Sequence, residues 1–237
     1  MLIPIVGALI YILLHAELGT LFFKGKKNQI IKMTKPLIPQ DKNILYDLER
    51  ESIYMAHLAK YVNDYGGYPI YKNTTVEYYS VGEEKYASML YELEKAERFI
   101  FMEYFIIDHG KMWNTILDIL ERKAEQGVEV RLLYDGMGSQ FLLPNHYDKY
   151  LETKGIKCRI FNEFRPFLST AQNNRDHRKI LVIDGTTAFN GGVNLADEYI
   201  NEKERFGHWK DTAVMLKGEA VWSFTLSLIH ISEPTRP

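Results

Sequence analysis

The sequence predicts an α/β fold in which helices cover both faces of one sheet. From Thr75 onward, short apolar runs rich in β-branched and aromatic residues alternate with segments of helical length. Neither Pro nor Gly interrupts these helical segments. The strand-like runs are largely apolar, which is typical of a sheet covered on both sides. The expected architecture is therefore an α/β/α sandwich, preceded by an apolar N-terminal helix.

Residues 1–23 are predicted to be a membrane segment. Residues 2–14 are apolar without a break, and residues 18–23 resume the run after Glu17. As a helix, residues 2–23 would reach about 33 Å, against a hydrocarbon core about 30 Å thick. Because a carboxylate is costly at the centre of a membrane, a helix ending near Leu14 with the next stretch at headgroup level is favoured. The basic residues follow the apolar run, which opposes a cleaved signal peptide and marks the cytoplasmic side.

Residues 24–70 are predicted to be a linker followed by a helix. Residues 24–42 are polar and basic and contain Pro36 and Pro39, as expected for a linker near anionic headgroups. Asn43–Asn63 carries apolar residues at near-helical spacing.

Residues 71–225 are predicted to form the α/β unit itself. The expected strands are Val76–Tyr79, Phe99–Ile106, Val128–Tyr134, Lys157–Phe161 and Lys179–Ile183. The expected helices are Glu83–Ala96, Met112–Gln126 and Asn145–Thr153. Active groups in such folds gather where strands end.

One constellation points to phosphodiester chemistry. His177, Lys179 and Asp184 stand at H-x-K-x4-D spacing and are followed by the G-G-x-N turn Gly191–Asn194. On a strand, His177 and Lys179 project to the same side. An imidazole with a pKa near about 6.5 can act as a nucleophile at neutral pH, and an adjacent ammonium offsets charge on phosphoryl oxygens. Each residue alone has an ordinary structural explanation, but the combination is specific.

This constellation resembles the first HKD motif of the phospholipase D superfamily, with its G-G-x-N extension intact. Arg98–Phe105, Gly127–Ser139 and His208–Thr212 are similar to bacterial cardiolipin synthases, and the resemblance extends from the N-terminus to about Thr225. It implies a phospholipase D-like α/β/α sandwich, of which this chain holds the first half only. It also implies chemistry that needs no metal and no other cofactor.

The resemblance assigns roles to individual residues. His177 is the expected nucleophile, Lys179 and Asn194 are expected to bind phosphate oxygens with Gly192, and Asp184 is grouped with the catalytic residues, although it is expected to support the motif rather than touch substrate.

Two acids are expected behind the reacting groups. Asp211 occupies the place of a superfamily acid that hydrogen-bonds the nucleophilic imidazole, and Glu103 matches a family position near the pocket. A surface acid and a buried structural residue are the respective alternatives.

The implied reaction is phosphatidyl transfer between two phosphatidylglycerol molecules, giving cardiolipin and glycerol through a phosphohistidine. The expected place is the bacterial cell membrane, with the catalytic part in the cytoplasm. The family takes its general acid from a second HKD motif, which this chain lacks. Its partners would then be phospholipid, the membrane, and either a C-terminal half with the second motif or a second copy of the chain. The chain alone is expected to be nearly inactive.

Composition restricts the alternatives. The chain of 237 residues is 46% hydrophobic and can bury a sizeable core. Residues 1–40 hold five Lys and one Glu, a charge of +4, which leaves −6 for the remainder of a chain whose net charge is −2. An acidic catalytic part opposes a nucleic-acid substrate, and hence a homodimeric nuclease. A non-catalytic membrane-anchored module also stays open. The single Cys158 excludes an intramolecular disulfide.

Residues 226–237 are predicted to be a non-native tail. They do not extend the preceding pattern and resemble the conceptual translation of a sequencing adapter; a natural terminal tail is the alternative.

Overall fold

The computed structural model describes residues 35–163 and 175–228, together with Gly7 and Tyr11. Its strands are β1 (Thr74–Tyr79), β2 (Phe99–Tyr104), β3 (Glu129–Asp135), β4 (Lys157–Phe161), β5 (Ile180–Ile183), β6 (Thr187–Gly191) and β7 (Ala213–Gly218). Its α-helices are α3 (Lys42–Glu51), α4 (Ile53–Tyr61), α5 (Gly82–Glu94), α6 (Lys111–Glu125), α7 (Tyr147–Thr153) and α8 (Val221–Ser227). Shorter helical turns are η1 (Lys35–Leu37), η2 (Val62–Gly66) and η4 (Asp197–Ile200).

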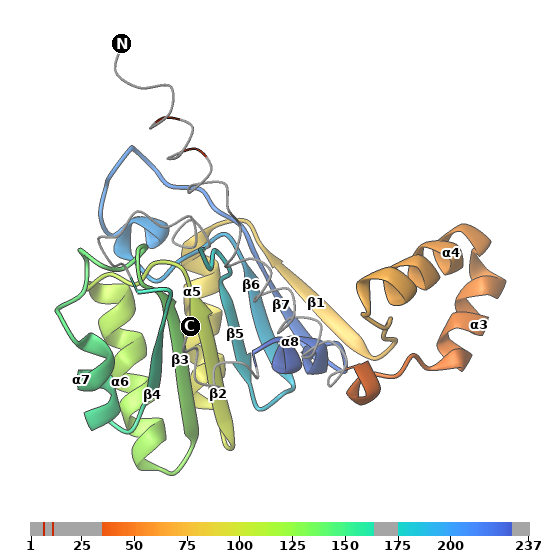
Figure 1. The fold of residues 1–237 in the computed structure, drawn as a ribbon, viewed down its shortest axis with the longest axis horizontal. Coiled ribbons are helices and arrows are strands. Elements are labelled where there is room, and N and C mark those ends of the chain that lie inside the picture. The colour runs from red at the N-terminus through yellow and green to blue at the C-terminus, as the bar shows by residue number, and fades with distance from the viewer. Residues whose placement is uncertain (1–6, 8–10, 12–34, 164–174, 229–237) are drawn as a thin grey trace.

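The strands form one seven-stranded mixed sheet in the order β1-β7-β6-β5-β2-β3-β4 (Figure 1). β2, β3 and β4 are parallel, whereas β5, β6, β7 and β1 pair antiparallel. β5 therefore lies in the middle of the sheet, between β6 and β2, and Ile180 is directly opposite Glu103. This register places the start of β5 beside the end of β2.

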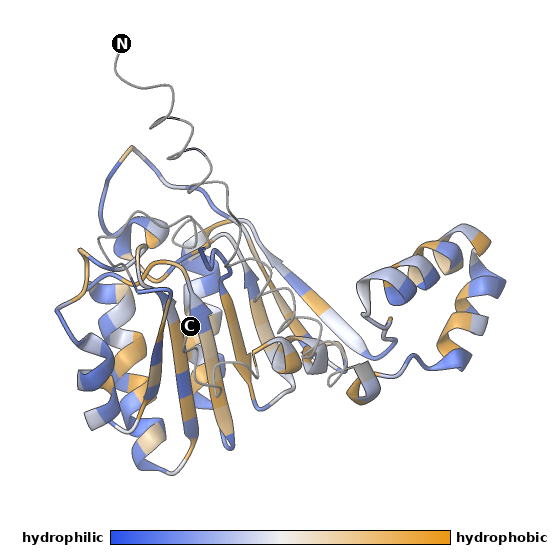
Figure 2. Ribbon diagram, viewed as in Figure 1, coloured by the Kyte–Doolittle hydropathy of each residue, from blue (hydrophilic) through white to orange (hydrophobic). Residues whose placement is uncertain are grey.

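Helices cover one face of the sheet over most of its strands and the other face over the central strands β5, β6 and β7. Helices α5, α6 and α7 pack on one face, where Met89, Trp113 and Leu151 are fully buried against strand residues such as Met102. Helix α8 covers the other face with a smaller cluster, which contains Phe101, Ile180, Val182, Val221 and Leu228. Figure 2 shows hydrophobic residues along the central strands. Burial of each such side chain contributes about 1.5–3 kcal/mol, so the two clusters hold the sheet as one unit.

Most predicted elements are present, with ends that differ by a few residues. The strand expected at Phe99–Ile106 ends at Tyr104, because the backbone N–H of Ile106 donates to the Asn194 side chain instead of a neighbouring strand. The strand expected from Lys179 begins at Ile180.

The single helix expected over Asn43–Asn63 is wrong. It divides at Ser52, whose backbone is extended (φ −158°, ψ 110°) and whose hydroxyl accepts from Met55 N at 3.4 Å. A serine that caps a helix N-terminus favours this break. Helices α3 and α4 project from the body of the molecule as a pair (Figure 1).

Both ends of the chain bear on the predicted domains. Within the ranges given above, no helix is long and apolar enough to cross a membrane. The predicted membrane segment, residues 1–23, lies outside the described residues except for Gly7 and Tyr11. Of the predicted tail, Leu226 and Leu228 are buried at the end of α8, at 7% and 0% exposure. Residues 229–237 lie outside the described part, so the non-native tail stays a prediction.

Candidate active site

The two central residues of the motif converge on one aromatic ring. His177 precedes β5 and is exposed, with its ring centroid 4.6 Å from that of Phe105, which directly follows β2. The ammonium nitrogen Nζ of Lys179 lies 5.3 Å from the centroid of the same Phe105 ring. The structure therefore brings the imidazole and the ammonium to the same side of the sheet edge.

Lys179 is a buried cation beneath an exposed imidazole. It is 5% exposed, and Nζ donates to the His177 carbonyl oxygen at 2.7 Å. Burial lowers the pKa of Lys179, and the negative charges of Asp211 and Asp176 partly oppose this shift. A bound anion would likewise raise the pKa of Lys179 and favour its charged form. Lys179 is thus positioned to stabilise negative charge next to His177.

Asp184 is not with this pair. It lies at the opposite end of β5, in the left-handed region (φ 53°). Its carboxylate accepts from the backbone N–H groups of Glu97, Arg98 and Phe99 at 2.9, 2.7 and 2.8 Å. The carboxylate oxygens of Asp184 therefore bind the backbone at the start of β2. The structure does not place Asp184 beside His177 and Lys179, with which it was grouped.

Asp211 and Gly192 form a tight contact behind the site. A Cβ on Gly192 would lie 1.9 Å from Asp211 Oδ1, so only glycine allows this approach. The Gly192 N–H donates to the Thr212 carbonyl at 2.9 Å. This argues against Gly192 binding phosphate through its N–H, because that hydrogen is already used. In the described part of the chain, no hydrogen bond joins Asp211 to His177; Asp211 instead acts electrostatically on Lys179.

The side chain of Asn194 connects the residues after β2 with η4. It is 2% exposed, its Oδ1 accepts from Ile106 N at 3.0 Å, and its Nδ2 donates to the Tyr199 hydroxyl at 2.8 Å. An amide nitrogen carries two hydrogens. Its predicted contact with phosphate would use the second.

Glu103 lies on the other face of the sheet. It is 1% exposed and forms an ion pair with Arg178, which also contacts Asp176 through Nε at 3.0 Å. Burial alone would raise the pKa of Asp176, but hydrogen bonds with Glu103 and Arg178 lower it overall. Arg178, between His177 and Lys179 in sequence, therefore points away from both. Glu103 supports the backbone of the motif rather than its reacting face.

Lys85 belongs to the site and was missed in the sequence. It is 2% exposed on α5, and Nζ donates to the Tyr104 hydroxyl at 3.2 Å and to the Val193 carbonyl, within the G-G-x-N turn, at 3.5 Å. Burial lowers its pKa to about 7, and Asp211 opposes the shift. The signal was its position on the apolar stripe of α5, at helical spacing from the buried Met89 and Leu93.

The arrangement places an exposed imidazole beside a buried ammonium group. Among the residues described, no group of three or more His, Cys, Asp or Glu is placed to hold a metal ion. Such a site suits attack on a phosphodiester, in which the protein supplies the nucleophile and the charge stabilisation.

A family model described as "Cardiolipin synthase, PLD-like domain" matches residues 89–218, more than half of the chain. The chain belongs to the cardiolipin synthase family of phospholipase D-like domains. The matched part of this family domain contains β2 to β7 and every expected site residue.

Relatives agree with this family. An uncharacterized protein from Streptococcus mutans is 50% identical over 98% of this chain and 50% of its own length. A cardiolipin synthase from Geobacillus kaustophilus is 42% identical over 71% of this chain and 33% of its own length. The chain thus spans no more than half the length of these relatives.

A solved structure supports the fold. Phosphatidylserine synthase from Haemophilus influenzae superposes with a TM-score of 0.51 at 18% identity, over 68% of this chain and 40% of the other. At this identity the likeness concerns the phospholipase D-like fold alone. The predicted α/β class and the resemblance to cardiolipin synthases are both confirmed.

Proposed function

We propose that this chain is the nucleophile-bearing half of a phosphatidyltransferase that makes cardiolipin from phosphatidylglycerol at the bacterial membrane. The observation that carries the proposal is the convergence of His177 and Lys179 on Phe105, with the imidazole exposed and the ammonium buried. Membership of the cardiolipin synthase family supports the substrate class.

The reaction proceeds in two displacements. A ring nitrogen of His177 attacks the phosphorus of one phosphatidylglycerol, forming an N–P bond as the P–O bond to glycerol breaks. Glycerol leaves with a proton from a general acid. The hydroxyl of a second phosphatidylglycerol then attacks the phosphorus, loses its proton to the base that the acid has become, and breaks the N–P bond to give cardiolipin. Lys179 and Asn194 stabilise the charge on the phosphoryl oxygens.

The general acid is assigned to a second motif, supplied by a C-terminal half or by a second copy of the chain. General acid catalysis contributes about 10²- to 10⁴-fold. We therefore expect the 237-residue chain alone to form almost no cardiolipin from phosphatidylglycerol. Clear turnover by the purified chain, abolished by His177→Ala, would contradict the need for a C-terminal half and would favour a second copy of the chain as the source of the acid.

The nucleophile can be tested without that acid. In a phosphatidyl p-nitrophenyl ester the leaving group departs as a stable anion, so the first displacement needs no proton. We expect a burst of p-nitrophenolate and a phosphatidyl adduct on the His177 peptide, measured by mass spectrometry after an alkaline quench. His177→Ala should abolish both, and Lys179→Met should slow the burst by about 10²-fold or more.

His57→Ala is the matched control, because His57 is an exposed histidine on α4, away from the motif. It should leave the burst unchanged. An adduct that persists in His177→Ala would overturn the proposed mechanism. Plasmid degradation that depends on His177 would instead favour the homodimeric nuclease.

A further inference from the structure

We propose that Asp135, at the end of β3, is a positioning residue for the nucleophile. Its carboxylate holds the backbone directly before His177, and the loop that it organises holds Phe105, against which the imidazole rests. The inference deepens the proposed function and depends on it only for the role of His177.

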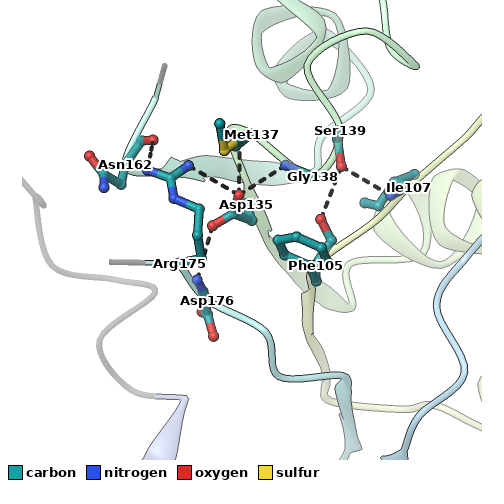
Figure 3. Close-up of polar contacts among 9 residues, drawn as sticks. All are labelled: Phe105, Ile107, Asp135, Met137, Gly138, Ser139, Asn162, Arg175 and Asp176. Atoms are coloured by element: carbon teal, nitrogen blue, oxygen red, sulfur yellow. Dashed lines mark hydrogen bonds and ion pairs between the residues drawn. The ribbon is translucent and has the colours of Figure 1, made fainter. Parts of the chain in front are cut away.

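The Asp135 carboxylate is fully buried and joins two segments (Figure 3). Within its own loop, Oδ1 accepts from the backbone N–H groups of Met137 and Gly138 at 2.9 and 3.0 Å. Across to the motif, Oδ1 pairs with Arg175 Nη1 at 3.2 Å, and Oδ2 accepts from Asp176 N at 2.9 Å. The strand β3 is thereby connected to the two residues before His177.

The segment that holds His177 has no ladder of strand hydrogen bonds, because β5 begins only at Ile180. The two residues that flank His177 are instead held by buried carboxylates, Asp176 by Asp135 and Arg178 by Glu103. Asp176 is held by Asp135 and accepts from Arg178 Nε at 3.0 Å, and Arg178 in turn pairs with Glu103 of β2. His177 is therefore suspended between two anchored residues, and the anchor on its N-terminal side is Asp135.

The same loop sets the position of the ring beside the imidazole. A Cβ on Gly138 would lie 2.2 Å from the Phe105 carbonyl oxygen, so the loop and Phe105 are in close contact. Ser139 Oγ donates to that oxygen at 3.4 Å and accepts from Ile107 N at 3.0 Å (Figure 3). The loop after β3 thus controls both the main chain and the aromatic neighbour of His177.

Asp135→Asn keeps the shape of the side chain and its contacts within the loop, but removes its contacts with Arg175 and Asp176. One amide oxygen can still accept from Met137 and Gly138, but an amide NH₂ would face the Asp176 N–H, so two donors would meet. Arg175, whose side chain is 15% exposed, would also lose its counter-charge. A buried group left without a partner is displaced at considerable cost. The strain would fall on the Arg175–His177 backbone.

The test is the binding of inorganic phosphate near neutral pH, followed by NMR through the His177 ring. In the unaltered chain, phosphate should perturb His177, and the ring current of Phe105 should shift its C–H resonances. We expect Asp135→Asn to weaken phosphate binding about tenfold or more, since a displacement of about 1 Å can cost up to about 10²-fold in a reaction. The ring-current shift should also decrease.

Asp197→Asn is the matched control. Asp197 also accepts two backbone N–H groups, from Lys111 and Met112 at 2.9 and 2.8 Å, but these start α6 and do not touch the motif. It should lower the melting temperature while leaving phosphate affinity and the His177 shifts unchanged. Arg175→Lys, which keeps the charge but loses the second contact with the Asn162 carbonyl, should reproduce part of the Asp135→Asn effect.

The outcomes separate the two proposals. If Lys179→Met leaves the phosphate response of the His177 ring unchanged, the proposed function fails. If Lys179→Met weakens phosphate binding but Asp135→Asn behaves like Asp197→Asn, the positioning role is wrong. Should Asp135→Asn fail to fold, Arg175→Lys decides, and an unchanged His177 spectrum in that variant would overturn the inference.

Discussion

Lys85 and Lys179 show how single residues set the charge of the site. Both are buried lysines, at 2% and 5% exposure, and both respond to the charge of Asp211. Burial lowers the pKa of Lys85 to about 7, so its charge changes near neutral pH. The Lys85 ammonium contacts the G-G-x-N turn, because it donates a hydrogen bond to the Val193 carbonyl oxygen. Substrate binding would favour its charged form.

Lys85 gives a prediction about stability and pH. Its pKa is about 7 when folded, against an ordinary value of 10.5. Below about pH 7 the lysine is charged in both states, so burial destabilises the fold fully; between about pH 7 and 10.5 the unfolded chain binds more protons, and stability rises with pH. We expect Lys85→Met to remove this rise and to stabilise the fold at low pH by several kcal/mol.

Urea unfolding at about pH 6 and about pH 9 measures this difference. Lys149→Met is the control, because the Lys149 side chain is 64% exposed. It should leave the pH dependence unchanged. Parallel stability profiles for the unaltered chain and Lys85→Met would refute the role given to Lys85.

At the scale of the element, β5 has two ends with different tasks. The residues before Ile180 include His177, the proposed nucleophile, whereas Asp184 after Ile183 binds the start of β2. One short strand therefore couples the site to the centre of the sheet. The x4 spacing of the H-x-K-x4-D motif spans this strand and places Lys179 and Asp184 at its opposite ends.

The loss of unfolding free energy on substitution of Asp184 should increase with the number of hydrogen-bond acceptors removed. Asp184→Asn keeps an oxygen for Arg98 and Phe99 and tolerates the positive φ, so we expect a loss of roughly 1–2 kcal/mol in unfolding free energy. Asp184→Ala removes every acceptor and adds backbone strain, so roughly 3 kcal/mol or more is expected. Guanidinium unfolding gives both values. If Asp184→Ala were as stable as Asp184→Asn, the three hydrogen bonds would not be what stabilises this end of β5.

At the scale of the whole molecule, the reactivity of Cys158 in β4 can show whether the sheet unfolds as one unit. Cys158 in β4 is 2% exposed and packs within the larger cluster, although β4 is an edge strand. Burial raises the pKa of its thiol, so little thiolate is present at neutral pH. Helix α7 and strand β3 both pack against β4, and we expect them to separate from it before a reagent reaches the sulfur.

We therefore expect the reaction of Cys158 with a disulfide reagent to follow global unfolding. The native chain should react at least about 10³-fold more slowly than the chain in concentrated denaturant, and the rate should rise with urea in parallel with loss of circular dichroism. Cys158 is the only cysteine, so the signal has one source. Fast reaction in a fully folded sample would show that β4 opens independently of the rest.

The sequence alone determined the class and the order of most helices and strands from β1 to β5, and it indicated candidate residues for the site. These follow from local information: apolar periodicity indicates element type, and the H-x-K part of the motif indicates that His177 and Lys179 share one side of the chain. The shared side of His177 and Lys179 follows from the two-residue alternation along an extended chain. The break at Ser52 and the burial of Lys85 also had local signals.

Only the tertiary structure decided which distant residues meet. The contacts of His177 with Phe105, of Asp176 with Asp135, and of the Gly192 backbone with Asp211 come from the order and register of the strands. Composition and periodicity carry no register between β2, β3 and β5, because each pairing depends on how all the strands pack. For this reason the sequence could indicate His177 as the candidate nucleophile, whereas only the fold shows which residues contact the segment that carries it.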